Sequence, residues 1–154
     1  MTTVNPTFSR AGRNSLEQLL ALMAEFYAGE ALPYDEALAR KGLDLLFTDE
    51  SLGRAWFIEV EGECAGYLVL AASFSLEFHG RDAFVDELYV RPAYRGRGLG
   101  THALERAMAE CRALGIHALH LEVDHDNPQA RALYERLGFV DHDRHLMTKW
   151  LLDE

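Results

Sequence analysis

LYVRPAYRGRGLGT, residues 88–101, is the most informative part of the sequence. Three glycines alternate with other residues from Gly96 to Gly100, and Arg95 and Arg97 stand among them. An apolar run typical of a strand precedes these glycines, and a helical pattern of apolar residues follows them. Glycines at such a junction let successive backbone N–H groups converge, and the helix N-terminus adds partial positive charge. The stretch predicts an anion-binding turn, with a glycine turn that holds no ligand as the alternative.

On the N-terminal side of this turn the sequence predicts a weak first strand, two helices and three further strands. Asn14 is a candidate cap for the first helix, and the second helix begins near Asp35. Alternating apolar residues then predict an antiparallel meander. The expected elements are a strand at residues 7–10, helices after residues 14 and 35, and strands at residues 55–60, 64–74 and 83–90.

On the C-terminal side the pattern predicts a helix, a strand, a helix and a final hairpin. Gly115 ends the first of these helices, and Asn127-Pro128 begins the second as a cap followed by a first-turn proline. The expected elements are a helix at residues 98–114, a strand at 117–123, a helix from 128, and strands at 139–140 and 146–151. The order β-α-α-β-β-β-α-β-α-β-β is a mixed α/β fold, which we expect to form one domain over residues 1–154.

Charge is distributed unevenly along this acidic chain. There are 25 Asp and Glu against 15 Lys and Arg, a formal net charge of −10. Residues 1–90 hold 15 acids and six bases, whereas residues 91–154 hold ten acids and nine bases. A chain this acidic lacks the clustered positive charge that binds nucleic acid or anionic membranes, so we expect neither as a partner. Two distant cysteines and no leader-like or membrane-spanning pattern lead us to expect a reduced, cytoplasmic protein.

The glycine turn also satisfies a second motif. Residues 98–103 fit the dinucleotide fingerprint G-x-G-x-x-A, with Glu122 or Asp124 at about the right distance for the acidic partner. Residues 91–94, however, separate the strand from the first glycine, and the preceding strands form a meander rather than βαβ units. Too few residues follow Asp124 to complete a doubly wound sheet. A dinucleotide-binding protein therefore remains the less favoured alternative.

Two motifs in this chain resemble those of the GNAT superfamily of N-acetyltransferases. Residues 95–100, RGRGLG, match its acetyl-CoA-binding motif Q/R-x-x-G-x-G/A, and residues 127–139 match its second motif, N-x-x-A-x-x-L-Y-x-x-x-G-F. The resemblance implies the GNAT fold, acetyl-CoA as cosubstrate, no metal, and direct acetyl transfer to a primary amine in a ternary complex. A homodimer is a further expectation from the family, and the acceptor would be a small molecule or a peptide.

The resemblance also implies roles for individual residues. Tyr134 would donate a proton to the departing thiolate, with a core aromatic side chain as the alternative, and Asn127 would contact the pantetheine, with a helix cap as its compatible alternative. The fourth predicted strand would pair with the pantetheine arm, and the glycine turn would hold the diphosphate. The implied cofactor-binding residues are Leu88, Tyr89, Val90, Arg95, Gly96, Arg97, Gly98, Leu99, Gly100, Thr101, Asn127 and Tyr134.

Amine acetylation needs a group that removes a proton. An alkyl amine of pKa ~10.4 is neutral in only about one molecule in 2,500 at pH 7, a handicap of roughly 4.6 kcal/mol. Strand alternation predicts that Asp86 and Glu87 point to opposite faces. We favour Glu87 as the base, directly or through a water, with Glu122 second and an exposed, solvated carboxylate as the alternative for each. The Leu88 N–H is the candidate donor to the carbonyl oxygen as it gains charge.

Acidic residues in the N-terminal half suggest a cationic acceptor. Candidate substrate-binding residues are Glu25, Tyr34 and Asp86, and a polyamine, a lysine-like amine or a peptide N-terminus would fit them. A non-catalytic acetyl-CoA sensor stays open as an alternative from another functional class.

Overall fold

The computed structural model describes residues 4–152. Contacts divide the chain into two units, one ending at Glu122 and the other starting at Val123. The prediction of one domain over the whole chain stays a prediction. The first unit contains β1 (Thr7–Arg10), α1 (Leu16–Gly29), α2 (Glu36–Thr48), β2 (Gly53–Val60), β3 (Glu63–Ser75), β4 (Gly80–Val90), α3 (Leu99–Ala113) and β5 (Ala118–His120). The second contains α4 (Pro128–Arg136).

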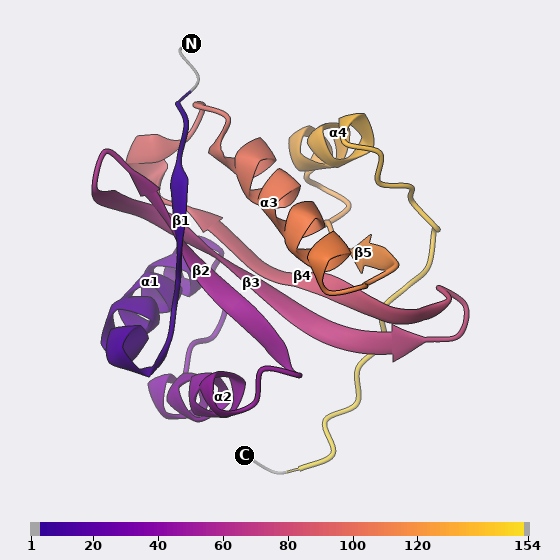
Figure 1. The fold of residues 1–154 in the computed structure, drawn as a ribbon, viewed down its shortest axis with the longest axis horizontal. Helices are drawn as coiled ribbons and strands as arrows, with labels where there is room; N and C mark the ends of the chain where they lie inside the picture. Colours follow the sequence, from indigo (N-terminus) through magenta and orange to yellow (C-terminus); the bar gives the residue numbers. More distant parts are fainter. Residues whose placement is uncertain (1–3, 153–154) are drawn as a thin grey trace. The chain divides into compact units, whose positions relative to one another are not determined.

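The strands form one sheet in the order β1-β2-β3-β4-β5 (Figure 1). The first four strands are antiparallel to their neighbours, so the predicted meander is confirmed. β5 pairs in parallel with β4, but only through Asp82–Phe84 and Ala118–His120. The second half of β4, residues 85–90, has no strand partner on that side in the part of the chain that the structure describes. Such an edge leaves backbone groups that can pair with an extended ligand.

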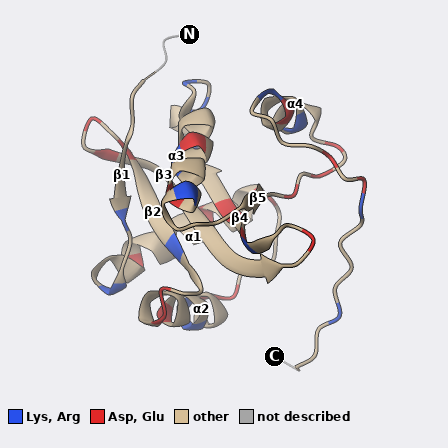
Figure 2. Cartoon of the chain, turned by 45° about the vertical axis from the view of Figure 1, so that its right-hand side comes forward, with Lys and Arg blue, Asp and Glu red and all other residues tan. Residues whose placement is uncertain are grey.

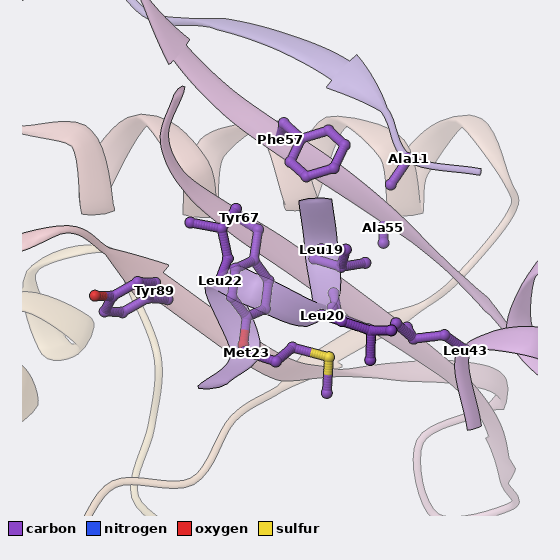
Figure 3. Close-up of a cluster of buried hydrophobic side chains, with 11 residues drawn as sticks. Ala11, Leu19, Leu20, Leu22, Met23, Leu43, Ala55, Phe57, Tyr67 and Tyr89 are labelled. Carbon is purple, nitrogen blue, oxygen red and sulfur yellow. The ribbon is translucent and has the colours of Figure 1, made fainter. Parts of the chain in front are cut away.

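Helices cover both faces of this sheet, with α1 and α2 on one face and α3 on the other (Figure 1). Figure 3 shows the cluster beneath α1 and α2, in which helix residues such as Leu19 and Met23 pack on Phe57 and Tyr67. On the opposite face the buried α3 residues Ala103 and Ala107 pack against the sheet. Each fully buried large apolar side chain contributes roughly 1.5–3 kcal/mol, which fixes the helices relative to the strands.

A β-bulge interrupts β4 at its midpoint. Val69 pairs with Glu87 and the next β3 residue, Leu70, pairs with Val85, which leaves Asp86 as the extra residue. A bulge bends its strand and breaks the two-residue alternation of side chains. The prediction that Asp86 and Glu87 point to opposite faces assumed an unbroken strand. With Asp86 as the extra residue, simple alternation no longer fixes the face of its side chain, so the predicted opposite faces stay a prediction.

The C-terminal part differs most from the sequence prediction. The strand expected at residues 117–123 is shortened to Ala118–His120, and the hairpin expected at 139–140 and 146–151 does not form strands. Asp141 does accept a hydrogen bond from the Asp143 N–H at 2.7 Å, so a local turn is present. A strand also needs a neighbour that takes its backbone hydrogen bonds, and these residues have no paired strand in the described chain.

The start of α1 also differs from the expected cap at Asn14. A short 3-10 turn, Arg13–Ser15, leads into the helix. The hydroxyl of Ser15 accepts from the Gly12 N–H at 3.0 Å and donates to the Gly12 carbonyl at 3.1 Å. In α2, by contrast, the Asp35 side chain caps the helix by accepting from the Leu38 N–H at 3.2 Å. The second predicted helix start is therefore confirmed.

Candidate functional site

The loop between β4 and α3 has the backbone geometry that the glycine pattern predicted. Gly96 and Gly98 have φ values of 77° and 79°, in the left-handed region that glycine adopts without strain. Gly98 is the N-cap of α3, and its carbonyl accepts the first helical hydrogen bond from the His102 N–H at 3.1 Å. Upstream, the Arg95 Nε donates to the Val90 carbonyl at 2.9 Å, which ties the loop to the end of β4.

This loop presents donors and positive charge together. The first N–H groups of an α-helix, here those of Leu99, Gly100 and Thr101, have no acceptor within the helix. Figure 2 shows basic positions in the loop that precedes α3, and the Arg97 guanidinium lies 5.5 Å from the ring centre of Tyr94. Free amides, a helix dipole and two arginines match the charge and hydrogen-bonding needs of a diphosphate. These residues therefore fit the phosphate end of acetyl-CoA.

The open half of β4 follows directly into this loop and contains the residues predicted to pair with a pantetheine arm. Leu88 and Val90 are partly buried and pack toward α3, whereas Tyr89 is buried toward α1. Figure 3 shows the Tyr89 hydroxyl pointing away from the apolar cluster. Within residues 4–152 no strand pairs with the backbone groups of β4 at this edge, and an extended amide-bearing ligand is suited to them.

Glu25, predicted to bind substrate, is held in an ion pair. Arg91 Nε and Nη2 each donate to one of its carboxylate oxygens at 3.1 Å, and the Tyr89 hydroxyl donates to one of them, also at 3.1 Å. This pairing joins α1 to the residue that follows β4. A carboxylate engaged by a guanidinium in a two-point contact is already neutralised, so its contacts favour a structural role.

Tyr34 and Asp86, the other two candidate substrate residues, are placed differently. The Tyr34 hydroxyl donates to the Leu20 carbonyl at 3.2 Å, and its ring lies edge-on to Tyr27 with centroids 5.4 Å apart. Asp86 is exposed at the bulge, and within residues 4–152 no hydrogen bond or ion pair engages its carboxylate. Asp86 is therefore the acidic group at this site that remains available to a cation.

Glu87, the favoured base, lies at the centre of a hydrogen-bonded cluster. One carboxylate oxygen accepts from the Tyr27 hydroxyl, and the other accepts from the Tyr67 hydroxyl at 2.7 Å. Burial raises the pKa of Glu87, while the two phenol hydrogen bonds act in the opposite direction and the charge of Asp86 adds to the increase. A carboxylate whose pKa is shifted toward neutrality is better suited to accept a proton.

The remaining predicted residues lie elsewhere in the chain. Glu122 is exposed, two residues beyond β5. Asn127 caps α4 by accepting from the Ala130 N–H at 3.2 Å, so its predicted capping alternative is confirmed. Tyr134 is partly buried in α4, with its ring 6.1 Å from that of Phe139, and burial raises the pKa of its phenol. Asn127 and Tyr134 both belong to the second unit.

Among residues 4–152 no group of three His, Cys, Asp or Glu side chains is arranged to hold a metal ion. In the same residues, no helix combines the length and the apolar character needed to cross a membrane.

Sequence reasoning missed Tyr27 and Tyr67. Tyr27 ends the apolar stripe of α1 and Tyr67 lies in a buried run of β3, so periodicity assigns both to the core. The available signal is that a buried tyrosine hydroxyl needs a hydrogen-bond partner. The sequence does not identify that partner, because Glu87 is 60 residues from Tyr27 and 20 from Tyr67.

Comparison with known proteins finds related acetyltransferases. A mycothiol acetyltransferase from Beutenbergia cavernae is 35% identical over 128 residues, covering 79% of this chain and 40% of the relative. A spermidine N(1)-acetyltransferase from Escherichia coli K12 is 34% identical over 87 residues, covering 56% of this chain and 45% of the relative. The chain thus spans less than half the length of these two curated relatives.

A solved structure and a family model extend the match. An integron cassette protein from the mobile metagenome of Cole Harbour Salt Marsh superposes with a TM-score of 0.83 at 33% identity, covering 96% of this chain and 91% of that one. Residues 16–139 match the acetyltransferase (GNAT) family model. That match includes both motifs, the open edge of β4 and the glycine turn, and it confirms the predicted fold. The chain belongs to the acetyltransferase (GNAT) family, whose enzymes use acetyl-CoA as acetyl donor.

Proposed function

We propose that this chain transfers the acetyl group of acetyl-CoA to a primary amine by direct attack within a ternary complex. The observation that carries the proposal is the position of Glu87, a partly buried carboxylate within the open edge of β4. The edge leads into the glycine turn, so a proton acceptor and a cradle for an anionic donor lie on one continuous segment, residues 87–101. The thioester supplies an activated acetyl group.

On the donor side, groups of this chain make each contact with acetyl-CoA. The amides of residues 96–101 hold the diphosphate, with Arg95 and Arg97 contributing charge and Thr101 a hydroxyl. Leu88 and Val90 offer backbone groups to the pantetheine arm, and the Leu88 N–H stabilises the carbonyl oxygen as it gains negative charge. Tyr134 supplies a proton to the leaving thiolate: its phenol is protonated at neutral pH, and burial raises its pKa above the ordinary value.

On the acceptor side Glu87 removes the amine proton, and Asp86 draws a cationic amine to the site. Two other acids of the N-terminal half of the chain already have partners. Glu25 pairs with Arg91, and Asp82 is buried with His120. The expected acceptor is therefore an amine recognised by one exposed carboxylate, such as a small polyamine or a lysine-like amine. The names of two relatives, a mycothiol and a spermidine acetyltransferase, support an amine-bearing small molecule.

The first test is release of CoA thiol from acetyl-CoA with a panel of polyamines, lysine-like amines, peptide N-termini and neutral amines. Turnover that depends on the acceptor supports the enzyme. A higher melting temperature in the presence of CoA, without turnover on the panel, supports a sensor instead. Stabilisation by NAD but not by CoA would identify the glycine turn as a dinucleotide site and refute the proposal.

Gly98→Ala tests the glycine turn directly. A side chain at a φ of 79° strains the backbone by about 1–2 kcal/mol and adds a methyl group where the diphosphate approaches. We expect CoA affinity to fall at least about tenfold in an isothermal titration, in line with a loss of ~1.4 kcal/mol.

Gly115→Ala is the matched control for this variant. Gly115 has a similar φ of 73° and open space around its Cα, but it lies at the other end of α3. It should show the same backbone strain with unchanged CoA affinity. Equal affinities of the two variants would refute the diphosphate site.

A further inference from the structure

The Glu87 cluster joins three elements of the first unit around one carboxylate. Tyr27 from α1 donates to Oε2, and Tyr67 from β3 donates to Oε1 at 2.7 Å. Each carboxylate oxygen thus has a phenol as a donor. An acceptor amine that approaches Glu87 meets a site whose two oxygens are already hydrogen-bonded.

The two phenols differ in access to solvent. Tyr67 is 0% exposed, and its ring packs against Phe26 at 6.2 Å and Tyr89 at 5.9 Å. Tyr27 is only partly buried, and its ring contacts Phe26 and Tyr34 edge-on at 5.7 and 5.4 Å. Of these two donors, Tyr27 is the one that a molecule arriving from solvent can contact.

The charges around the cluster favour passing a proton from Tyr27 to Glu87. Burial and the nearby carboxylate of Glu87 raise the pKa of both phenols, so both stay protonated at neutral pH. The other titratable groups that act on the cluster are Asp86 on β4 and Tyr34 beyond α1. Among residues 4–152, the negative charge in direct hydrogen-bond contact with Tyr27 is that of Glu87.

We propose that Tyr27 relays the proton from the acceptor amine to Glu87 and that Tyr67 is a positioning residue that holds the carboxylate. The inference rests on the proposed acetyl transfer. An ammonium N–H bond breaks as its proton moves to the Tyr27 oxygen, and the Tyr27 O–H bond breaks as its own proton moves to Glu87 Oε2. The products are a neutral amine, an unchanged phenol and a protonated Glu87, which later releases the proton to water.

The test compares wild type with Tyr27→Phe, Tyr67→Phe and the packing control Phe26→Leu. The control removes the ring that lies against Tyr27, Tyr67 and Tyr89 but leaves every hydroxyl in place. Rates of thiol release across pH 5–9, with CoA affinity and far-UV circular dichroism, are measured for each protein. Removing a general acid-base group typically costs 10²–10⁴-fold, so Tyr27→Phe should lower kcat about 100-fold with CoA affinity unchanged.

Tyr67→Phe should act mainly on the pH profile. The lost hydrogen bond stabilised the charged carboxylate, so the pKa of Glu87 rises and the acidic limb of kcat/KM moves to higher pH. Phe26→Leu should lower the melting temperature without moving that limb. Carbon-13 NMR of labelled glutamate in the free protein follows the Glu87 titration independently of activity. It should show the same increase in the pKa of Glu87 in Tyr67→Phe.

Three outcomes would overturn the inference. Turnover of Tyr27→Phe at the rate of Phe26→Leu refutes the relay, and an unmoved Glu87 titration in Tyr67→Phe refutes the positioning role. Both of these leave acetyl transfer by the wild type standing. A wild type that releases no thiol with any amine overturns the proposed function and the relay together.

Discussion

Asp82 and Glu87 are two carboxylates on β4 that each have two side-chain hydrogen-bond partners. They differ in how far the surrounding strands enclose them. Asp82 accepts from the Ser73 hydroxyl at 2.6 Å and lies 2.9 Å from His120 Nε2, much as Glu87 accepts from two tyrosines. Asp82 is 3% exposed, with β3 paired on one side of it and β5 on the other. Glu87 lies where β5 has ended and a bulge has bent the strand.

The difference shows that hydrogen bonding alone does not distinguish a carboxylate with a structural role from one that can take part in a reaction. The Asp82 contacts are enclosed between strands, with the His120 ring packed against Phe78 and Phe84 at 4.4 and 4.9 Å. At 3% exposure, Asp82 is almost entirely closed to a reactant. Around Glu87 one donor, Tyr27, remains partly exposed, so the same kind of contact stays open to a substrate.

Glu87→Gln should produce the largest effect, which is on turnover. Glutamine keeps the shape of the side chain: its carbonyl accepts from one phenol and its amide can donate to the oxygen of the other, but it cannot take a proton. We expect kcat to fall about 10²–10⁴-fold with CoA affinity unchanged, measured by thiol release and calorimetry. A kcat within threefold of wild type would assign the proton transfer to another group, with Glu122 the next candidate.

Asp82→Asn should produce the converse result, a loss of stability with little change in turnover. The amide replaces one acceptor oxygen by a donor, so Ser73 or His120 loses its partner in a buried site. An unsatisfied buried polar group costs about 1–3 kcal/mol, measurable by urea unfolding. Ser73→Ala is the milder control, at about 1 kcal/mol. If Asp82→Asn lowered kcat as much as Glu87→Gln, the contrast between the two acids would be wrong.

The sequence predicted the parts of this comparison that depend on local pattern. The meander, the glycine turn and the short strand Thr7–Arg10 all follow from residue spacing and are present. Glu87 is predicted as the base because it is a carboxylate of the fourth predicted strand, near the reacting centre. The prediction of a final hairpin is wrong. Its apolar pattern indicates strand propensity but does not supply the neighbouring strand with which each strand must pair. Met147 and Trp150 of that segment are 90% and 87% exposed.

What the sequence could not predict depends on packing between distant segments. The bulge at Asp86 comes from a register shift between β3 and β4, and neither strand shows it alone. His120 alternates with its neighbours like any strand residue, yet its partner is 38 residues away. Tyr27 and Tyr67 match a core pattern, and only the fold brings their hydroxyls to one carboxylate. These contacts distinguish the two acids.

Asp86→Asn should have a smaller effect, confined to cationic acceptors. An exposed charge contributes about 0–1 kcal/mol to an ion pair, so KM for a polyamine should rise at most about fivefold. KM for a neutral amine should not change, and the difference should shrink at high salt, because salt screens exposed charges. Equal changes for charged and neutral acceptors would show that Asp86 acts through the bulge rather than through its charge.

The smallest predicted effect concerns the stability of Glu87→Gln. The pKa of Glu87 is raised in the folded protein, so folding favours its protonated form. The associated stability is present at low pH and is lost as pH rises through the folded pKa of Glu87. Glutamine is neutral at every pH, so the variant should match wild type near pH 4 and melt at a slightly higher temperature near pH 8. Asp82→Asn should be less stable than wild type at pH 8. A Glu87→Gln protein that is less stable there as well would mean that both acids stabilise the fold, and the open edge of β4 would no longer set them apart.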